Sequence, residues 1–358
     1  MHLMASPRSS TRRGVWCGLL AAVSFGVSAP FAQRLLAHVD AQLLAGLLYL
    51  GAGLVLVFAG PARRRQETPV RRSDRSRLAV VVVAGGVVAP VLLLTGLERV
   101  SAMAGSLTLN LEAPFTAVLA VWVFREHLSR RAWLAGLIIV AGATVLGLAP
   151  GPMSNDPIGI ALIALACGAW AIDNNLTQGL TARDPIAIVR TKAFGAAVAN
   201  VSIALLRGSD FPAAWVIVAA LALGGLSYGL SVVLDAYALR SLGAAREAAL
   251  FATAPFAGVI VAIVVLGEDV TGGSVAALVL MALGTSLLLT DRHVHRHTHV
   301  ALAHEHRHVH DEHHAHDHAD GADPSEPHAH WHKHEPVVHG HAHVSDAHHR
   351  HGHGDEDH

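Results

Sequence analysis

The chain has 358 residues, of which 52% are hydrophobic and only 15% are charged, and its mean hydropathy is +0.43. Soluble domains carry about 25% charged residues, so this composition argues against a soluble protein and favours one that spans a membrane. The net charge of −1 divides unevenly, into +7 for residues 1–290 and −8 for residues 291–358. Nucleic-acid-binding arms are rich in Lys and Arg, so the acidic second part predicts no nucleic-acid partner.

Ten apolar segments follow one another before residue 290. Each has about the 20 residues that a helix needs to cross a bilayer, and backbone groups in lipid must pair within their own segment, which favours helices. Residues 1–13 hold three arginines, as a signal peptide does, but no clean cleavage site follows, so we interpret the next run as a membrane helix. The predicted spans are 14–32, 41–60, 78–97, 102–124, 132–149, 158–178, 185–206, 213–237, 246–266 and 272–290.

Arginine marks alternate connections between these spans. One set of connections, together with both terminal segments, holds most of the arginines, whereas the opposite set holds only Arg34, Arg99 and Arg207. The positive-inside rule then assigns both termini to the cytoplasm. We therefore expect a multi-pass protein of the cell (inner) membrane, with residues 291–358 on the cytoplasmic side.

The chain also resembles itself at an offset of about 141–145 residues. Residues 109–115, LNLEAPF, match residues 250–256, LFATAPF, and a glutamate follows each proline about a dozen residues later, Glu126 and Glu268. Because each unit has five spans, the second must enter the membrane in the opposite orientation. Such inverted repeats are common in secondary transporters, whose substrate site lies near the midplane between the repeats. The predicted fold is an all-α integral membrane protein of ten transmembrane helices in two inverted five-helix repeats, 14–149 and 158–290, between a cytoplasmic segment 1–13 and a disordered tail 291–358.

This layout resembles the EamA type of the drug/metabolite transporter (DMT) superfamily over about residues 14–290. The resemblance rests on the duplicated ten-span plan, on the Pro-Phe segments of the fourth and ninth spans, and on Phe25-Gly26 echoed by Trp170-Ala171. It implies import or export of small metabolites, amino acids or drugs by a protein that is not an enzyme. The chain has no Gly-rich loop followed by Lys-Ser/Thr, which argues against ATP-driven pumping.

Glu112 is the most informative charged residue within a span. A charge at the bilayer centre costs at least about 2.5–3.5 kcal/mol on insertion scales, and Glu112 lies about 16 Å into its span at about 1.5 Å per residue. Asn110 lies two residues earlier, and Pro114 and its counterpart Pro255 predict paired interruptions of two helices, which point to a central site. Glu112 then binds an amine-bearing or cationic substrate or carries a proton; the alternative is a structural carboxyl hydrogen-bonded between helices.

Charged residues also lie near the cytoplasmic ends of three later spans. Asp173, followed by Asn174, lies in the sixth span, and Lys192 lies in the seventh, whose start is marked by Asp184 before a proline. An ion pair that fixes the packing of these two helices is the favoured interpretation, and a cytoplasmic gate or substrate clamp is the other. In the eighth span, Asp235 either pairs with Arg240 or faces water.

The tail contains 24 of the 27 histidines. Its low apolar content and repetition predict disorder. Histidines at every second position lie on one side of an extended chain. Imidazole suits zinc, nickel and cobalt, so the tail is predicted to bind divalent metal. The alternative is a pH-responsive, solubilising tail. The candidate metal ligands are His304, His306, His308, His310, His313, His314, His316, His318, His328, His330, His332 and His334.

Two classes of function compete. The first is a proton-coupled carrier of small organic solutes that its tail regulates, and the second is a nickel, cobalt or zinc transporter whose tail buffers the cargo; a membrane-anchored metal store ranks third. Metal carriers usually show metal-binding side chains at helix spacing within their spans, and no histidine lies within a span here, so the organic solute ranks first. We expect the lipid bilayer and a small-molecule substrate as partners and no required cofactor, and a homodimer stays open.

Overall fold

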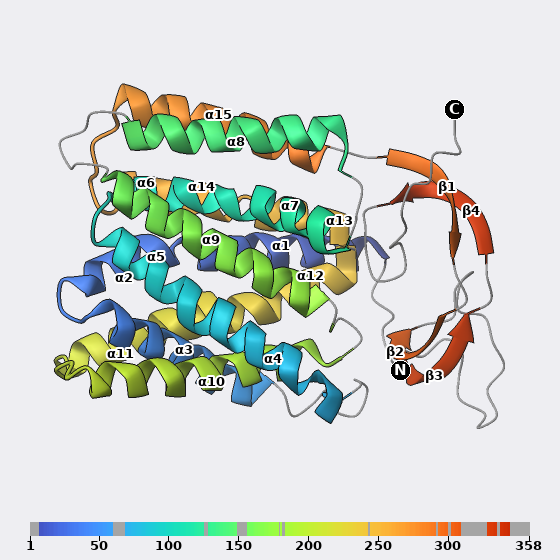
Figure 1. Cartoon of the computed structure of the whole chain (residues 1–358), viewed down its shortest axis with the longest axis horizontal. Helices are drawn as coiled ribbons and strands as arrows, with labels where there is room; N and C mark the ends of the chain where they lie inside the picture. The colour runs from blue at the N-terminus through green and yellow to red at the C-terminus, as the bar shows by residue number, and fades with distance from the viewer. Residues whose placement is uncertain are drawn as a thin grey trace.

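The structure is a computed structural model that describes residues 7–59, 69–124, 128–148, 156–178, 180, 183–242, 244–290, 293–299, 302–308, 328–334 and 337–343. Ten helical segments of this described part are long and apolar enough to cross a membrane, judged by length and composition. They run alternately in opposite directions, so that α1 begins and α15 ends at the same end of the bundle (Figure 1). We call this the tail end, and the other the opposite end.

The first repeat forms five spans from short and long helices. Its elements are α1 (Pro7–Gly26), α2 (Ser28–Leu36), α3 (Ala41–Ala59), the 3₁₀ turn η1 (Arg72–Asp74), α4 (Arg75–Val81), the π-helix η2 (Val82–Val88), α5 (Ala89–Leu97), α6 (Ala102–Thr108), the 3₁₀ turn η3 (Leu109–Leu111), α7 (Glu112–Phe124) and α8 (Arg130–Leu148).

The second repeat forms the other five spans. Its elements are α9 (Pro157–Gln178), α10 (Pro185–Leu206), α11 (Ala214–Gly224), the π-helix η4 (Gly225–Leu230), α12 (Ser231–Leu242), α13 (Ala244–Phe251), α14 (Ala254–Val264) and α15 (Gly272–Leu289). The predicted start of the seventh span is confirmed, because the Asp184 carboxylate accepts hydrogen bonds from the N–H groups of Ile186 (2.9 Å) and Ala187 (3.2 Å) and caps α10.

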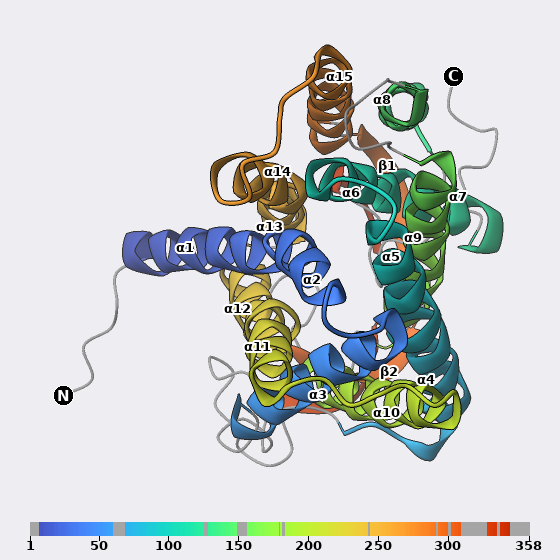
Figure 2. The same cartoon turned by 90° about the vertical axis from the view of Figure 1, so that its left-hand side faces the viewer.

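The helix pairs repeat with the sequence. The first span of each repeat packs on the third span of the other, α1 on α12 and α9 on α5. Equivalent spans of the two repeats also pair directly, α3 with α10 and α8 with α15. An end-on view shows α8 with α15 at one edge of the bundle and α3 with α10 at the other (Figure 2). The prediction of ten helices in two inverted repeats is therefore confirmed.

Glycines allow the closest of these crossings. A Cβ at Gly224 would lie 1.9 Å from the carbonyl oxygen of Leu48, and one at Gly51 would lie 2.1 Å from that of Leu221. Lipid is as apolar as the side chains, so membrane helices associate mainly through close packing, and small residues let their backbones approach one another. Glycine is therefore required where α3 and α11 cross.

Each repeat also interrupts its helices at matching places. The π-helices η2 and η4 lie in the third and eighth spans, and the fourth and ninth spans change conformation at η3 and at residues 252–253. Pro114 and Pro255 follow these two interruptions directly. Such irregular turns inside helices are frequent at functional sites, so they point to the middle of the bundle as the place of a functional site.

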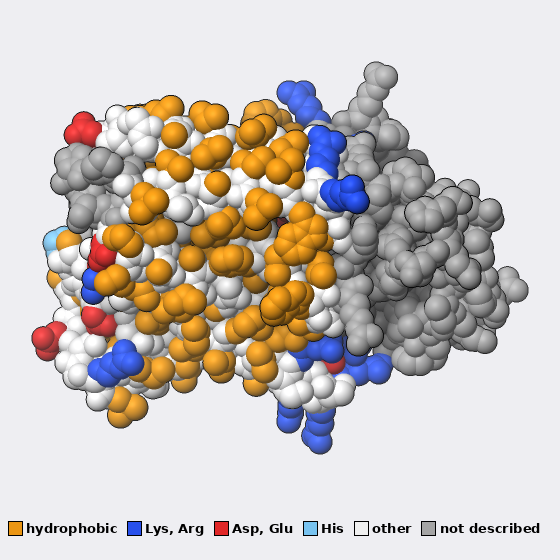
Figure 3. All heavy atoms as spheres, turned by 45° about the horizontal axis from the view of Figure 1, so that its top comes forward, with side chains coloured by type: hydrophobic (Ala, Val, Ile, Leu, Met, Phe, Trp, Pro, Cys, Tyr) orange, Lys and Arg blue, Asp and Glu red, His pale blue; other side chains and the backbone are white. Residues whose placement is uncertain are grey.

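The flank of the bundle is apolar. Side chains such as Phe58, Trp122 and Leu206, which are 83%, 79% and 87% exposed, form part of a surface dense in hydrophobic groups, and Lys and Arg side chains gather at its tail end (Figure 3). In water so large an apolar surface would be unfavourable, whereas a bilayer solvates it. The protein is thus a multi-pass membrane protein.

Four segments of the tail form short strands that the prediction of a disordered tail did not include. Strand β1 (His293–His299) pairs antiparallel with β4 (Val337–His343), and β2 (Leu302–His308) pairs antiparallel with β3 (His328–His334). An alternating sequence also suits an extended strand, which accounts for the difference. The candidate ligands His310, His313, His314, His316 and His318 lie outside the described residues.

Candidate functional site

A cavity of about 190 Å³ lies inside the bundle, lined by helices of both repeats. We call it the central cavity. Seven of the ten spans contribute its polar and aromatic groups, and it occupies the middle of the bundle and the half towards the tail end. Its polar side chains are Glu112, Asp173, Asn174, Lys192, Ser231 and Asp235, and its aromatic ones are Phe25, Tyr49, Trp170, Tyr228 and Phe251.

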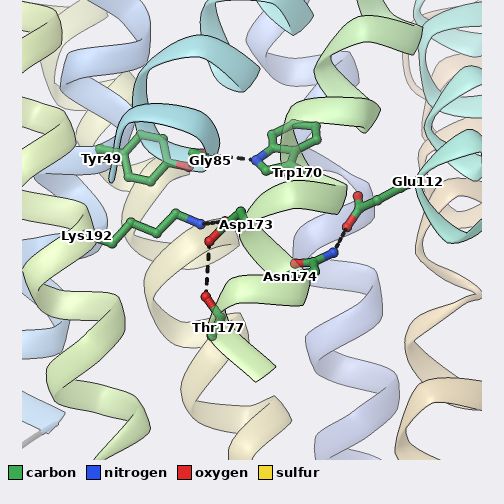
Figure 4. A network of polar contacts seen from close by, with 8 residues as sticks. All are labelled: Tyr49, Gly85, Glu112, Trp170, Asp173, Asn174, Thr177 and Lys192. Atoms are coloured by element: carbon green, nitrogen blue, oxygen red, sulfur yellow. Dashed lines mark hydrogen bonds and ion pairs between the residues drawn. The ribbon is translucent and has the colours of Figure 1, made fainter. Parts of the chain in front are cut away.

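Asp173 of α9 and Lys192 of α10 form an ion pair at the wall of the cavity (Figure 4). The Asp173 side chain is only 4% exposed, and its Oδ1 also accepts a hydrogen bond from Thr177 Oγ1 at 3.1 Å. Paired charges with further hydrogen bonds are the usual way in which charge is tolerated away from water. The two residues that sequence reasoning placed near one another are therefore in contact.

The π-helix η2 makes room for this pair. A Cβ at Gly85 would lie 2.0 Å from Asp173 Oδ2, so any larger residue would displace the carboxylate. A π-turn also shifts backbone pairing from the fourth residue to the fifth, which leaves a carbonyl group without its helical partner. Gly85 O accepts from Tyr49 Oη at 2.7 Å and from Trp170 Nε1 at 3.1 Å. Gly85 thus both makes room for the Asp173 carboxylate and accepts hydrogen bonds from two aromatic side chains of the cavity.

Glu112 reaches the cavity from the first residue of α7. Its Oε1 accepts a hydrogen bond from Asn174 Nδ2 at 2.7 Å (Figure 4). In the described part of the chain the ion pairs join Arg99 with Asp156, Arg183 with Asp74, and Lys192 with Asp173. Glu112 is not among them, so its charge is met by an amide and not by a cation.

Asn110 does not line the cavity, although it is only two residues from Glu112. Its Nδ2 donates to Leu107 O at 2.9 Å, and its Oδ1 accepts from Thr285 Oγ1 of α15 at 3.4 Å. Residues two apart lie on nearly opposite sides of a helical turn. The structure therefore separates Asn110 from the other candidate residues and assigns it to the contact with α15.

Asp235 lines the cavity from α12 and lies beside a second carboxyl group. That group belongs to Glu247 of α13, and the Oδ1 of Asp235 is buried without a partner among the described residues. The side chain of Arg240, the partner expected from the sequence, lies outside the described part.

Sequence reasoning missed Glu247 and most of the aromatic wall. Glu247 is the second residue of its predicted span, which made it look like a helix end. Phe25 contacts Phe251 and Tyr228 at centroid distances of 5.3 and 5.7 Å, and Tyr228 stacks on Tyr49 at 5.7 Å. These rings give the cavity an apolar wall with ring faces and hydroxyl groups.

The opposite end of the bundle is tied together by side chain to backbone contacts. Glu268, in the loop after α14, accepts hydrogen bonds from the N–H groups of Ala102 (2.6 Å) and Met103 (2.8 Å) at the start of α6. Gln33 of α2 donates to Leu97 O at 2.8 Å and to Val100 O. The contacts of Glu268 join the two repeats, whereas those of Gln33 join two spans of the first repeat. Glu126, the counterpart of Glu268, lies outside the described residues.

Comparison with known proteins agrees with this architecture. A model of the EamA-like transporter family matches residues 12–148 and 157–290, which are the two repeats. An uncharacterized transporter of Methanothermobacter thermautotrophicus is 29% identical over 270 residues, which cover 70% of this chain and 78% of the relative. A solved crystal structure of a protein with 20% identity superimposes with a TM-score of 0.57 over 79% of this chain and 98% of that one, and this likeness concerns the fold alone.

Proposed function

This chain belongs to the EamA-like transporter family, and we propose that it is a secondary transporter that moves a small organic solute through the central cavity, coupled to protons. The observation that carries the proposal is the cavity itself, which both repeats line at the level of their helix interruptions. In transporters built from inverted repeats, substrate binds near the midplane at interrupted helices, and one repeat then moves against the other.

The chemistry of the cavity supports an organic cargo. Small-molecule sites combine apolar and aromatic walls with a few polar groups that orient the ligand, and the rings around Tyr228 with the carboxyl of Glu112 fit that description. A metal cargo would need several free ligands that converge on one point. Here Asp173 is neutralised by Lys192, and Glu112 is bound to an amide.

Proton coupling is assigned to Glu112. A carboxyl group without a cationic partner at the middle of a membrane is stable when it is protonated or when it meets a cationic ligand. Alternation between these two conditions would exchange a proton for a solute.

A pair of measurements tests this assignment. First, metabolite profiles of cells with and without the protein identify the solutes that it moves. The flux of such a solute into proteoliposomes under a pH gradient is then compared for the wild type, Glu112→Gln and Glu98→Gln, a control outside the spans. We expect gradient-driven flux to be lost in the first variant and retained in the second. Unchanged proton-coupled flux in Glu112→Gln would show that coupling resides elsewhere.

We further propose that the tail responds to divalent metal, or to pH, from the cytoplasmic side of the inner membrane. The strand register sets His304 opposite His332, His306 opposite His330 and His308 opposite His328, and β1 with β4 sets three more histidines opposite histidines. Imidazole binds zinc, nickel and cobalt, so histidines that face one another across paired strands support metal binding by the tail.

Truncation after Thr290 tests the role of the tail. We expect the truncated protein to move the organic solute but to lose both metal binding, measured by elemental analysis of the dialysed protein, and any response of flux to added zinc, nickel or cobalt. If truncation instead abolishes uptake or efflux of these metals while organic solutes never move, the metal is cargo and the protein is a divalent metal transporter. Reporter fusions at both termini test the cytoplasmic orientation that the arginine distribution supports.

A further inference from the structure

The central cavity offers no free cation to a bound molecule. Lys192 is the only Lys or Arg among the described residues that line it, and its ammonium group is bound to Asp173. Asp173 is in turn fixed by Thr177 and fits against Gly85, where a Cβ would lie 2.0 Å from Oδ2. A substrate carboxylate would have to separate this ion pair before Lys192 could bind it.

The cavity does offer negative charge. Glu112 meets only the amide of Asn174, and Asp235 keeps a buried Oδ1 without a partner among the described residues. A carboxylate brought in by a substrate would face these groups and the desolvation of its own charge. An ammonium group would gain a charge-assisted hydrogen bond at Glu112.

The aromatic wall adds a preference for an apolar body. Phe25 contacts both Tyr228 and Phe251, and such ring faces attract cations as well as apolar groups. The volume of about 190 Å³ is below the roughly 300–1,000 Å³ of sites for drug-sized ligands. The space therefore suits one small molecule.

We propose that the central cavity selects small apolar or aromatic primary amines and discriminates against the amino acids that carry the same side chains. This inference rests on the proposed function, because it names the class of solute that the carrier binds. The ammonium group binds at Glu112, and the apolar body lies along the rings around Tyr228. The carboxylate of an amino acid is disfavoured because no free cation is present to pair with it. Discrimination arises from the unpaired charge in the rejected molecule as much as from contacts to the accepted one.

Matched pairs of ligands test the preference. The full-length protein in detergent is titrated with 2-phenylethylamine and phenylalanine, then with isoamylamine and leucine, which differ only by the carboxylate, and with 3-phenylpropionate, which lacks the amine. Binding is measured by calorimetry, and flux is measured in proteoliposomes. We expect each amine to bind at least about tenfold more tightly than its parent amino acid, and the carboxylate to bind least.

Two variants of Glu112 connect the preference to that carboxyl group. Glu112→Asp keeps the charge and should keep the amine preference, whereas Glu112→Gln should reduce amine affinity at least about tenfold. Glu98→Gln lies outside the spans and is the control, and it should leave the affinities and the order of ligands unchanged. Gel filtration and thermal unfolding identify variants that fail to fold.

The outcomes separate this inference from the proposed function. Equal or tighter binding of phenylalanine, or no binding of either amine, overturns the amine preference, and in the first case coupled flux of phenylalanine would leave the carrier assignment intact. Tight amine binding that depends on Glu112 but yields no flux of any solute retains the amine site and overturns the carrier assignment.

Discussion

The two repeats share their backbone interruptions but not their charges. The π-helices η2 and η4 correspond, and so do the interruptions before Pro114 and Pro255. At the same places the side chains differ, since Glu112 of the first repeat aligns with Thr253 of the second, whose hydroxyl group donates to Leu250 O. The common backbone features are part of the architecture that the two repeats share, whereas the unequal side chains give this chain its polar cavity.

The unequal charges also explain why the cavity lies towards the tail end. Asp173 and Lys192 both belong to the second repeat, and they pair beside Gly85 of the first. The opposite end has no buried ion pair among the described residues, and it is held by the hydrogen bonds of Glu268 and Gln33 and by the exposed pair of Arg99 and Asp156. If one repeat moves against the other during transport, the polar groups of the cavity stay in place while the contacts that close the two ends of the bundle open one after the other.

The largest effect is expected from breaking the buried ion pair. Lys192→Met leaves the Asp173 carboxylate buried and uncompensated, which destabilises proteins by about 3–5 kcal/mol. The double variant Lys192→Met/Asp173→Asn removes both charges and should recover most of this loss. Thermal unfolding in detergent measures both. If the single and double variants are equally unstable, the pair does not have the structural role that its burial indicates.

A substitution in the first repeat should disturb the same pair from the other side. Gly85→Ala introduces a Cβ 2.0 Å from Asp173 Oδ2, and overpacking of this kind costs about 1–3 kcal/mol. Gly272→Ala is the matched control, because nothing lies within 4 Å of the added Cβ. We expect the unfolding temperature to fall in the first variant only. Equal stability of the two would mean that η2 and α9 are not in the close contact described.

The spans and the repeat were predictable because each rests on a strong signal in the sequence. About twenty apolar residues have no other stable arrangement in a bilayer, and the contact of Asp173 with Lys192 follows from the opposite directions of consecutive spans. Pro114 and Pro255 gave the places of the interruptions, since proline lacks the N–H that a continuous helix needs.

Contacts that depend on helix rotation and crossing were not predictable. The direction of Asn110 is set by the 3₁₀ turn that contains it, and the meeting of Asp235 with Glu247 requires α12 and α13 to cross at a particular height. The π-helix that exposes Gly85 O to Tyr49 has no periodicity that marks it in the sequence. The candidate site was thus found at Glu112, Asp173 and Lys192, while its aromatic wall and second carboxyl required the structure.

A smaller effect is expected at the tie between the repeats. The Glu268 carboxylate satisfies two N–H groups at the start of α6, and loss of such a cap costs about 1 kcal/mol. We expect Glu268→Ala to lower the unfolding temperature by a few degrees, whereas Asp269→Ala, at the exposed neighbouring residue, should have no effect. An equal response of both variants would assign the effect to the loop and not to the cap.

The smallest effect is expected at the exposed pair of Arg99 and Asp156, 2.9 Å apart in the loops at the opposite end. The pKa of the Asp156 carboxyl lies below its usual value, first because the Ile158 N–H donates to it and second because Arg99 contacts it. A lowered pKa contributes stability above the unfolded-state value of about 3.9, and this contribution is lost as the pH falls through the folded-state value. Arg99→Gln removes only the second cause, so the unfolding temperatures of wild type and variant should differ slightly at pH 6 and converge towards pH 3, with a smaller difference in high salt. A difference that grows on acidification would contradict this sign, because protonation of Asp156 at low pH removes the charge that Arg99 contacts.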